Sequence, residues 1–251
     1  MNKTKIEWCD MTWNPVTGCL HGCEYCYARR ISRRFDRLCS ENSTCHESGE
    51  FYKRIAPLGY EKKYYPSGFD PTFFGHRLDE PIKIKTSQNI FVCSMADLFG
   101  DWVPDEWIKQ VFEACTKAPW HRYLFLTKNP KRYRELYDEK KFPYAENYWF
   151  GTSCTKPSDE FTWFKNTPYK CFASIEPLLE PFGVLDSDVL LDWIIIGRET
   201  GNRKDKIIPK KEWIENIVNY CREKNVPVFM KNNLKDIWQE PLIQEYPWRN
   251  K

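Results

Sequence analysis

The stretch Ile90-Phe91-Val92-Cys93-Ser94-Met95-Ala96-Asp97 joins a short apolar run to a polar segment. An apolar run of this length and composition is typical of a strand that is buried on both faces. Similar runs recur at positions 123–126, 148–150, 171–173, 193–196 and 228–230. Strands buried on both faces occur mainly in parallel sheets covered by helices, so these runs predict an α/β fold.

Helical patterns lie between several of the predicted strands. Apolar residues recur at helical spacing after Pro104 and after Pro209, and a shorter helix is expected from Pro130. Proline is favoured at the start of a helix, where its missing N–H is harmless. Strands that alternate with helices form right-handed βαβ units, which predicts a parallel sheet or barrel.

Polar residues follow nearly every predicted strand. They are Ser94 with Asp97, Thr127 with Lys128, Thr152 with Ser153, Ser174 with Glu176, Gly197-Arg198-Glu199, and Lys231. The carboxyl ends of parallel strands share one face, and ligands bind there. Loops are polar even where they bind nothing, so the collective pattern carries more weight than any one residue.

Composition and charge limit the class of protein. The 251 residues are 41% hydrophobic, which is enough for a sizeable core and excludes a disordered chain. Lys and Arg number 38 against 35 Asp and Glu, and this balance does not by itself favour a nucleic-acid or membrane partner. We find no signal peptide or membrane span and expect a cytoplasmic protein. Residues 1–251 are interpreted as one domain, with an irregular insertion at 39–81 and a C-terminal extension at 232–251.

Three of the 11 cysteines lie within the eight residues Cys19-Leu20-His21-Gly22-Cys23-Glu24-Tyr25-Cys26. Without an export signal a disulfide framework is not expected, which leaves metal binding or buried thiols. Structural zinc needs four ligands, and His21 is badly placed between Cys19 and Cys23 to share that ion. Cys39 and Cys45 could supply a fourth ligand and otherwise have no clear role. A [4Fe–4S] cluster on three cysteines would leave one iron open to another ligand.

The spacing Cys-x3-Cys-x2-Cys, with an aromatic residue before the third cysteine, resembles the signature of the radical S-adenosylmethionine (radical SAM) superfamily. Further blocks look like those of an uncharacterised, phage-associated family of radical-SAM-like proteins: Ile6 to Pro15, Arg77 to Pro81, Ser94 to Phe99, Leu126 to Lys128, Ser174 to Leu179 and Gly197 to Gly201. The resemblance implies a partial (β/α)6 TIM-like barrel of parallel strands with the irregular insertion after its first helix. Its cluster loop would follow a first strand near Met11 to Val16.

The same resemblance implies a cofactor and a reaction. Cys19, Cys23 and Cys26 would hold a [4Fe–4S] cluster, and the open iron would bind S-adenosylmethionine. Reductive cleavage would yield a 5′-deoxyadenosyl radical that abstracts hydrogen from a substrate. A one-electron donor such as flavodoxin or ferredoxin would then be a partner.

Seven residues are candidates for binding S-adenosylmethionine. Tyr25 would lie against the adenine, as in the superfamily, and the Ser94 to Asp97 segment would contact the methionyl amine. The remaining candidates are Ser153, Ser174 and Glu176 for the ribose hydroxyls, and Glu199 in a Gly-flanked turn. Three of these assignments have an alternative: Tyr25 as a core ring, the Ser94 to Asp97 segment as a helix cap, and Glu199 as the ion-pair partner of Arg198.

One cluster of like charge follows the cysteines: Arg29, Arg30, Arg33, Arg34 and Arg37. On a helix these residues face much the same way, so the stripe could bind the phosphates of a nucleotide or nucleic acid, or be solvated and pair with the acidic insertion. The alternative to an enzyme is a non-catalytic protein, stabilised by zinc or an iron–sulfur cluster, that binds nucleic acid through this stripe.

Overall fold

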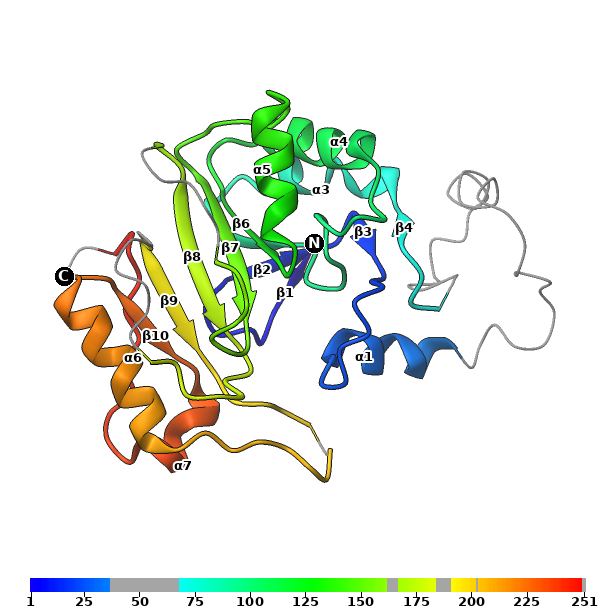
Figure 1. The fold of residues 1–251 in the computed structure, drawn as a ribbon. Helices are drawn as coiled ribbons and strands as arrows, with labels where there is room; N and C mark the ends of the chain where they lie inside the picture. The colour runs from blue at the N-terminus through cyan, green and yellow to red at the C-terminus, as the bar shows by residue number, and fades with distance from the viewer. Residues whose placement is uncertain (37–67, 162–166, 184–190, 202, 250–251) are drawn as a thin grey trace. The chain divides into compact units, whose positions relative to one another are not determined.

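The computed structural model describes residues 1–36, 68–161, 167–183, 191–201 and 203–249 (Figure 1). It has a mixed α/β fold whose main sheet contains eight strands in the order β1-β2-β5-β6-β7-β8-β9-β10. The predicted α/β class is confirmed, while hydrogen bonds between the described strands do not close this sheet into a ring. Cys39, Cys45 and most of the predicted 39–81 insertion lie outside the described residues.

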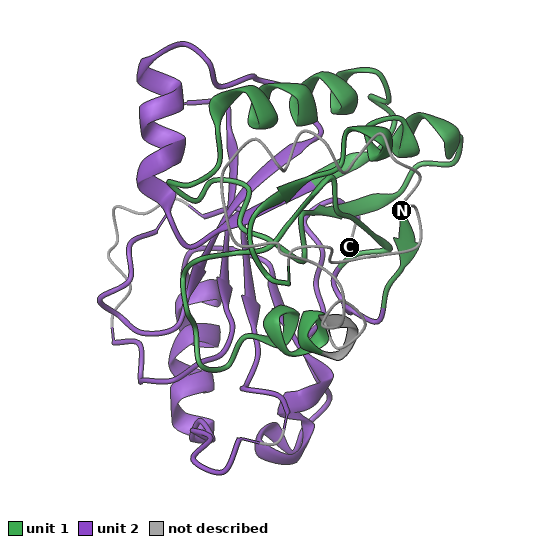
Figure 2. Ribbon diagram, turned by 90° about the vertical axis from the view of Figure 1, so that its right-hand side faces the viewer, with its two compact units in different colours: residues 1–4, 9–123 green, residues 5–8, 124–251 purple. Residues whose placement is uncertain are grey.

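The chain divides into two compact units (Figure 2). Unit 1 contains residues 1–4 and 9–123, and unit 2 contains residues 5–8 and 124–251. The boundary between Tyr123 and Leu124 falls inside strand β6 (Arg122–Thr127), whose first two residues belong to unit 1 and the others to unit 2. Each unit is described in turn.

Unit 1 has a parallel strand pair at its centre. Strand β2 (Met11–Trp13) pairs in parallel with β5 (Asn89–Val92), and β1 (Asn2–Lys3) pairs with β2 in the antiparallel sense. A second sheet joins β3 (Val16–Thr17) to β4 (Thr72–Phe73). The helices are α1 (Tyr27–Asp36), η1 (Gly75–Arg77), α3 (Glu80–Lys83) and α4 (Asp105–Thr116). The expected strand near residue 90 and the helix after Pro104 are therefore confirmed. The strand expected near Met11 to Val16 is shorter, because β2 ends at Trp13 and Val16 belongs to the second sheet.

Unit 2 consists of parallel strands with intervening helices. Strands β7 (Tyr148–Cys154), β8 (Lys170–Ile175), β9 (Trp193–Ile196) and β10 (Val228–Met230) pair in parallel, each with the next. The helices are α5 (Pro130–Asp138), α6 (Lys211–Glu223), η2 (Asn232–Leu234) and α7 (Lys235–Trp238). Every apolar run predicted between residues 123 and 230 forms a strand. The polar residues that were predicted to follow these strands therefore lie at their carboxyl ends.

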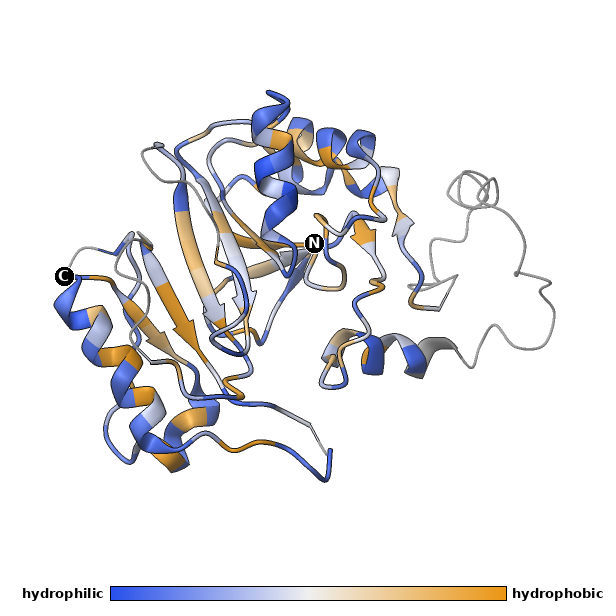
Figure 3. Ribbon diagram, in the orientation of Figure 1, coloured by the Kyte–Doolittle hydropathy of each residue, from blue (hydrophilic) through white to orange (hydrophobic). Residues whose placement is uncertain are grey.

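Buried apolar side chains pack the strands and helices of unit 2 against one another. All four residues of β9 are buried, and hydrophobic colour runs along this strand and appears on α6 in Figure 3. Ile214, Ile217 and Cys221 of α6 pack into the same cluster as β9. Tight packing extends to Gly151 in β7, where a Cβ atom would lie 2.3 Å from the Phe172 ring. No helix in the described ranges combines the length and apolar character needed to cross a bilayer.

The core thiol of Cys115 makes stability depend on pH. Burial raises the pKa of this α4 thiol well above its ordinary value, so the folded protein keeps the proton where the unfolded chain loses it. The unfolded state then binds fewer protons, and the free energy of unfolding falls as the pH rises above about 9. The free energy of unfolding, measured by urea titrations between pH 8 and 10, should fall less steeply with pH in Cys115→Ala than in the wild type. The difference in slope should be up to about 1.4 kcal/mol per pH unit. Equal slopes for the variant and the wild type would contradict this assignment.

Candidate functional site

The cysteine loop, Gly18 to Cys26, connects β3 to α1 and is fixed where it begins. The Gly18 N–H donates to Met95 O at 2.9 Å, and the Cys19 N–H donates to Phe69 O at 3.0 Å. Gly18 has φ +86°, and a Cβ atom there would lie 2.1 Å from Asp70 O. Only glycine combines this conformation with so close a backbone approach. The loop therefore starts from a rigid position before its first thiol.

The three thiols of the cysteine loop are half-buried, and backbone N–H groups lie against two of the sulfurs. The Arg29 N–H donates to Cys26 Sγ at 3.3 Å. Burial raises the pKa of Cys19 to about 12, repulsion from Asp97 and from the other two thiolates adds to this, and a hydrogen bond from the His21 backbone opposes it. A cation beside Cys19 would favour the thiolate that burial disfavours.

The donor chemistry of the loop fits an iron–sulfur centre. The described residues contain no group of three or more His, Cys, Asp or Glu side chains converged on a metal position, so the three sulfurs share a loop without being arranged as ligands. Two nearby donors, Arg29 Nε and Trp102 Nε1, are buried without an acceptor among the described residues. Thiolate and sulfide sulfurs accept such hydrogen bonds, and three thiols are the number that leaves one iron of a [4Fe–4S] cluster open.

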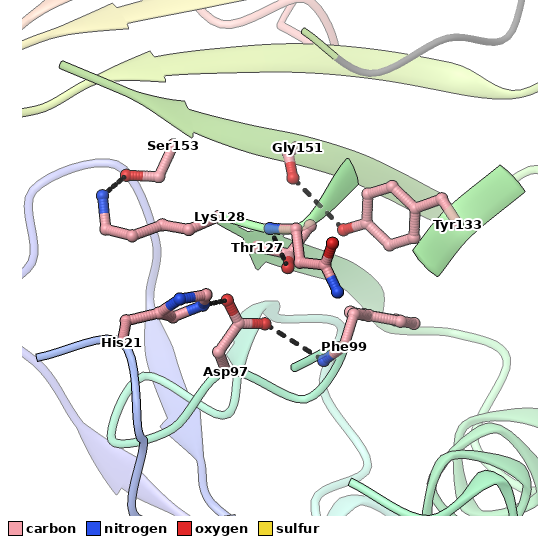
Figure 4. A network of polar contacts seen from close by, with 9 residues as sticks. His21, Asp97, Phe99, Thr127, Lys128, Tyr133, Gly151 and Ser153 are labelled. Carbon is pink, nitrogen blue, oxygen red and sulfur yellow. Dashed lines mark hydrogen bonds and ion pairs between the residues drawn. The ribbon is translucent and has the colours of Figure 1, made fainter. Parts of the chain in front are cut away.

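His21 is turned toward Asp97, as Figure 4 shows. Its Nε2 donates to Asp97 Oδ2 at 2.7 Å, and the Phe99 N–H donates to Asp97 Oδ1 at 3.0 Å. The imidazole also meets Trp102 edge to face, with ring centroids 4.8 Å apart. Asp97, the candidate for the methionyl amine, thus also fixes the position of the cysteine loop.

The polar segment after β5 is also tied to residues on either side of the cysteine loop. The Tyr27 hydroxyl donates to Ser94 O at 2.5 Å. Asn14 Oδ1 accepts from Ser94 Oγ at 3.2 Å and from the Met95 N–H at 2.9 Å. Sequence reasoning placed Ser94 and Asp97 near the cysteines but missed Asn14. The available signal was its place in the first of the blocks that carry the family resemblance.

The arginine stripe is only partly outward-facing. Arg29 Nη2 donates to Cys19 O at 3.0 Å, and its guanidinium lies 5.3 Å from the centre of the Phe69 ring. Arg33 is exposed, and Arg30 is half-buried. The side chains of Arg34 and Arg37 lie outside the described residues. One of the five arginines therefore supports the cysteine loop, a role that sequence reasoning did not find.

In unit 2 the candidate residues at the strand ends pair with lysines. The Lys128 ammonium donates to Ser153 Oγ at 2.9 Å, as Figure 4 shows. Lys231 forms an ion pair with Glu176, whose other carboxylate oxygen accepts from Ser174 Oγ at 3.3 Å. The two lysines, which the sequence placed at strand ends without partners, thus hold these candidates in position.

Gly197, at the carboxyl end of β9, makes room for the Lys231–Glu176 pair. A Cβ atom on this residue would lie 2.8 Å from Glu176 Cγ and 3.0 Å from Lys231 Cδ. The strand ends of β8, β9 and β10 therefore meet at one charged pair. Glycine is required by this approach rather than by an unusual backbone conformation.

Glu199 is buried, and its charge is neutralised. Both carboxylate oxygens accept from Arg203, at 2.9 and 2.7 Å. The ion-pair alternative for Glu199 is thus observed with Arg203 and not with Arg198, whose guanidinium lies 3.3 Å from Asp236. Tyr25 is half-buried in the cysteine loop. Its predicted position against an adenine stays a prediction.

Comparison with known proteins assigns the chain to a family without assigning a reaction. The sequence matches the family described as "Protein of unknown function (DUF5131)" over residues 3–240. No curated protein gave a significant match. No solved structure did so either. Because the match covers nearly the whole sequence, both the cysteine loop and the strand-end residues fall within it, and the chain belongs to the DUF5131 family.

Proposed function

We propose that the protein is a radical SAM enzyme and that its parallel strands form the partial (β/α)6 barrel of such enzymes. The observation that carries the proposal is the attachment of the three-cysteine loop to the polar segment after β5, through the 2.7 Å contact between His21 and Asp97. This contact places the loop that carries the three thiols beside the segment that contains Ser94 and Asp97, two candidate cofactor-binding residues.

In this proposal Cys19, Cys23 and Cys26 hold a [4Fe–4S] cluster. Together with S-adenosylmethionine the bound cluster supplies reductive cleavage to a 5′-deoxyadenosyl radical, which abstracts hydrogen from the substrate. The protein's own residues position and shield this chemistry. The Arg29 N–H stabilises charge on the Cys26 sulfur, and His21, held by Asp97, keeps the loop against the β5 segment.

The remaining candidates retain capacity to bind the cofactor. A carboxylate oxygen has more than one lone pair, so Asp97 can accept from an ammonium while it accepts from His21 and Phe99. The Ser153 hydroxyl accepts from Lys128 and still has a proton to donate. Tyr25, Ser174, Glu176 and Glu199 complete the proposed set. Flavodoxin or ferredoxin is the proposed class of electron donor, in the cytoplasm, where thiols stay reduced.

Anaerobic reconstitution tests the proposal. Protein treated with iron and sulfide should bind about four iron atoms per chain, the content of one [4Fe–4S] cluster. After reduction with dithionite, the electron paramagnetic resonance signal should shift when S-adenosylmethionine is added, and 5′-deoxyadenosine should accumulate.

Two results would contradict the proposal. Bound zinc with no cleavage of S-adenosylmethionine would favour the non-catalytic, nucleic-acid-binding alternative. Roughly eight irons per chain would instead indicate a second cluster, where the proposal has one.

A further inference from the structure

A cavity of about 280 Å³ lies in unit 2, beyond the carboxyl end of β9. It is lined by Arg198, Glu199, Thr200, Gly201, Lys206, Ile207, Ile208 and Asn233. These residues come from two places only, the segment after β9 and the η2 turn after β10. The volume is near the lower end of the range for small-molecule sites, which suits a ligand smaller than a dinucleotide.

The walls of this cavity are held by specific contacts. The Arg198 N–H donates to Asn233 Oδ1 at 3.2 Å, and Asn233 Nδ2 donates to Arg198 O at 2.9 Å. The Lys206 ammonium donates to Gly201 O at 2.6 Å. An ion pair between Arg203 and Glu199 also joins two residues of the segment after β9. Hydrogen bonds and an ion pair thus hold the segment that forms the cavity.

The charge of the cavity wall is positive. Glu199 is neutralised by Arg203, and Asp236, the partner of Arg198, is 81% exposed, so this ion pair is weak and its arginine can be recruited by a ligand. Lys206 has no carboxylate partner among the residues that the structure describes. Among the lining residues Arg198 and Lys206 are basic, and Glu199 is the acidic one. An anion is therefore the ligand that the wall favours.

One side of the cavity is apolar and open to solvent. Ile207 is 39% exposed and Ile208 is 63% exposed. They are adjacent in sequence, line the same cavity, and are the only aliphatic pair among the exposed large hydrophobics of the described residues. A ligand that covers them must carry an apolar or aromatic body in addition to its anionic group.

We propose that this cavity binds a phosphate monoester with an aromatic body, of the class of nucleoside monophosphates. Arg198 and Lys206 take the phosphate, for which guanidinium and ammonium groups are suited, and Ile207 with Ile208 takes the base. Glu199, which also lines this cavity, belongs to the set proposed to bind S-adenosylmethionine, so binding is measured on protein without iron and without turnover to keep the two proposals separable.

Isothermal titration calorimetry with AMP, GMP, CMP and UMP, each tested singly, addresses the inference. At least one should bind saturably at one site per chain and more tightly than inorganic phosphate. Arg198→Gln and Lys206→Gln should each weaken binding about tenfold. Lys204→Gln is the matched control, because it removes the same charge from the same segment at an exposed residue that does not line the cavity, and it should change the affinity less than about twofold.

The apolar side of the cavity is tested separately. Ile208→Ser should weaken binding of the nucleotide but leave the affinity for inorganic phosphate unchanged. The inference is wrong if no nucleotide binds more tightly than inorganic phosphate, or if Lys204→Gln has the same effect as Lys206→Gln. Displacement of the nucleotide by S-adenosylmethionine, which has no phosphate, would also overturn it, because the cavity would then belong to the cofactor site.

Discussion

Replacing Cys23 by alanine is expected to abolish both the iron–sulfur signal and the formation of 5′-deoxyadenosine. Cys23 is the central thiol of a loop that offers only three, and two cysteines cannot keep a [4Fe–4S] cluster that needs at least three. The iron content after reconstitution should fall from about four atoms per chain toward zero. Iron analysis and chromatography of the reaction with dithionite and S-adenosylmethionine measure the two effects.

Cys9→Ala provides the matched control for this experiment. It makes the same chemical change at a buried cysteine outside the loop, so iron content and product should stay at the wild-type level. If Cys23→Ala kept a full complement of iron, the ligand assignment would be wrong. If both variants lost iron equally, general destabilisation and not ligation would be the cause.

Trp193→Ala should give the largest loss of stability, about 3–5 kcal/mol in the free energy of unfolding. Trp193 is fully buried in β9, and its ring centroid lies 5.0–6.4 Å from those of Trp8, Phe172, Phe229, Tyr246 and Trp248. Its Nε1–H donates to Glu245 O at 2.9 Å. Truncation would leave a cavity among aromatic rings and an unsatisfied carbonyl. Urea unfolding gives the change from the midpoint and the slope.

Two variants separate the contributions to this loss. Trp193→Phe keeps most of the ring volume and removes the hydrogen bond to Glu245, so a loss of about 1–3 kcal/mol is expected. Trp213→Ala truncates a tryptophan that is only partly buried against the core and should cost less than Trp193→Ala. A loss below about 1 kcal/mol for Trp193→Ala would show that the aromatic cluster does not stabilise unit 2.

The apolar runs predicted the parallel strands because those strands are buried on both faces. The run at 193–196, for example, is β9, and the one at 90–93 begins within β5. The short strands β1, β3 and β4 were missed, since two residues carry no periodicity. The sequence did not indicate that Lys5–Trp8 belong to the same compact unit as residues 124–251, because packing partners far away in the sequence leave no local signal.

For the site, the spacing of Cys19, Cys23 and Cys26 gave the candidate ligands, but not the contacts that support their loop. The His21–Asp97 hydrogen bond joins residues 76 positions apart, and only the folded chain brings them together. The partner of Glu199 was misassigned for a geometric reason. The chain turns at Gly201, which has φ +95°, and this turn returns Arg203 to the carboxylate.

The aromatic core of unit 2 has a consequence for how the protein is made. Trp8 packs against Phe172 and Trp193, and the Tyr246 hydroxyl donates to Glu7 O across 239 residues. Trp8 therefore leaves the ribosome long before the side chains that bury it, and it stays exposed to solvent for most of translation. Contacts of such long sequence separation form slowly. Folding of unit 2 is expected to finish only after residues as late as Tyr246 have been synthesised, because these late residues pack on the segment around Trp8.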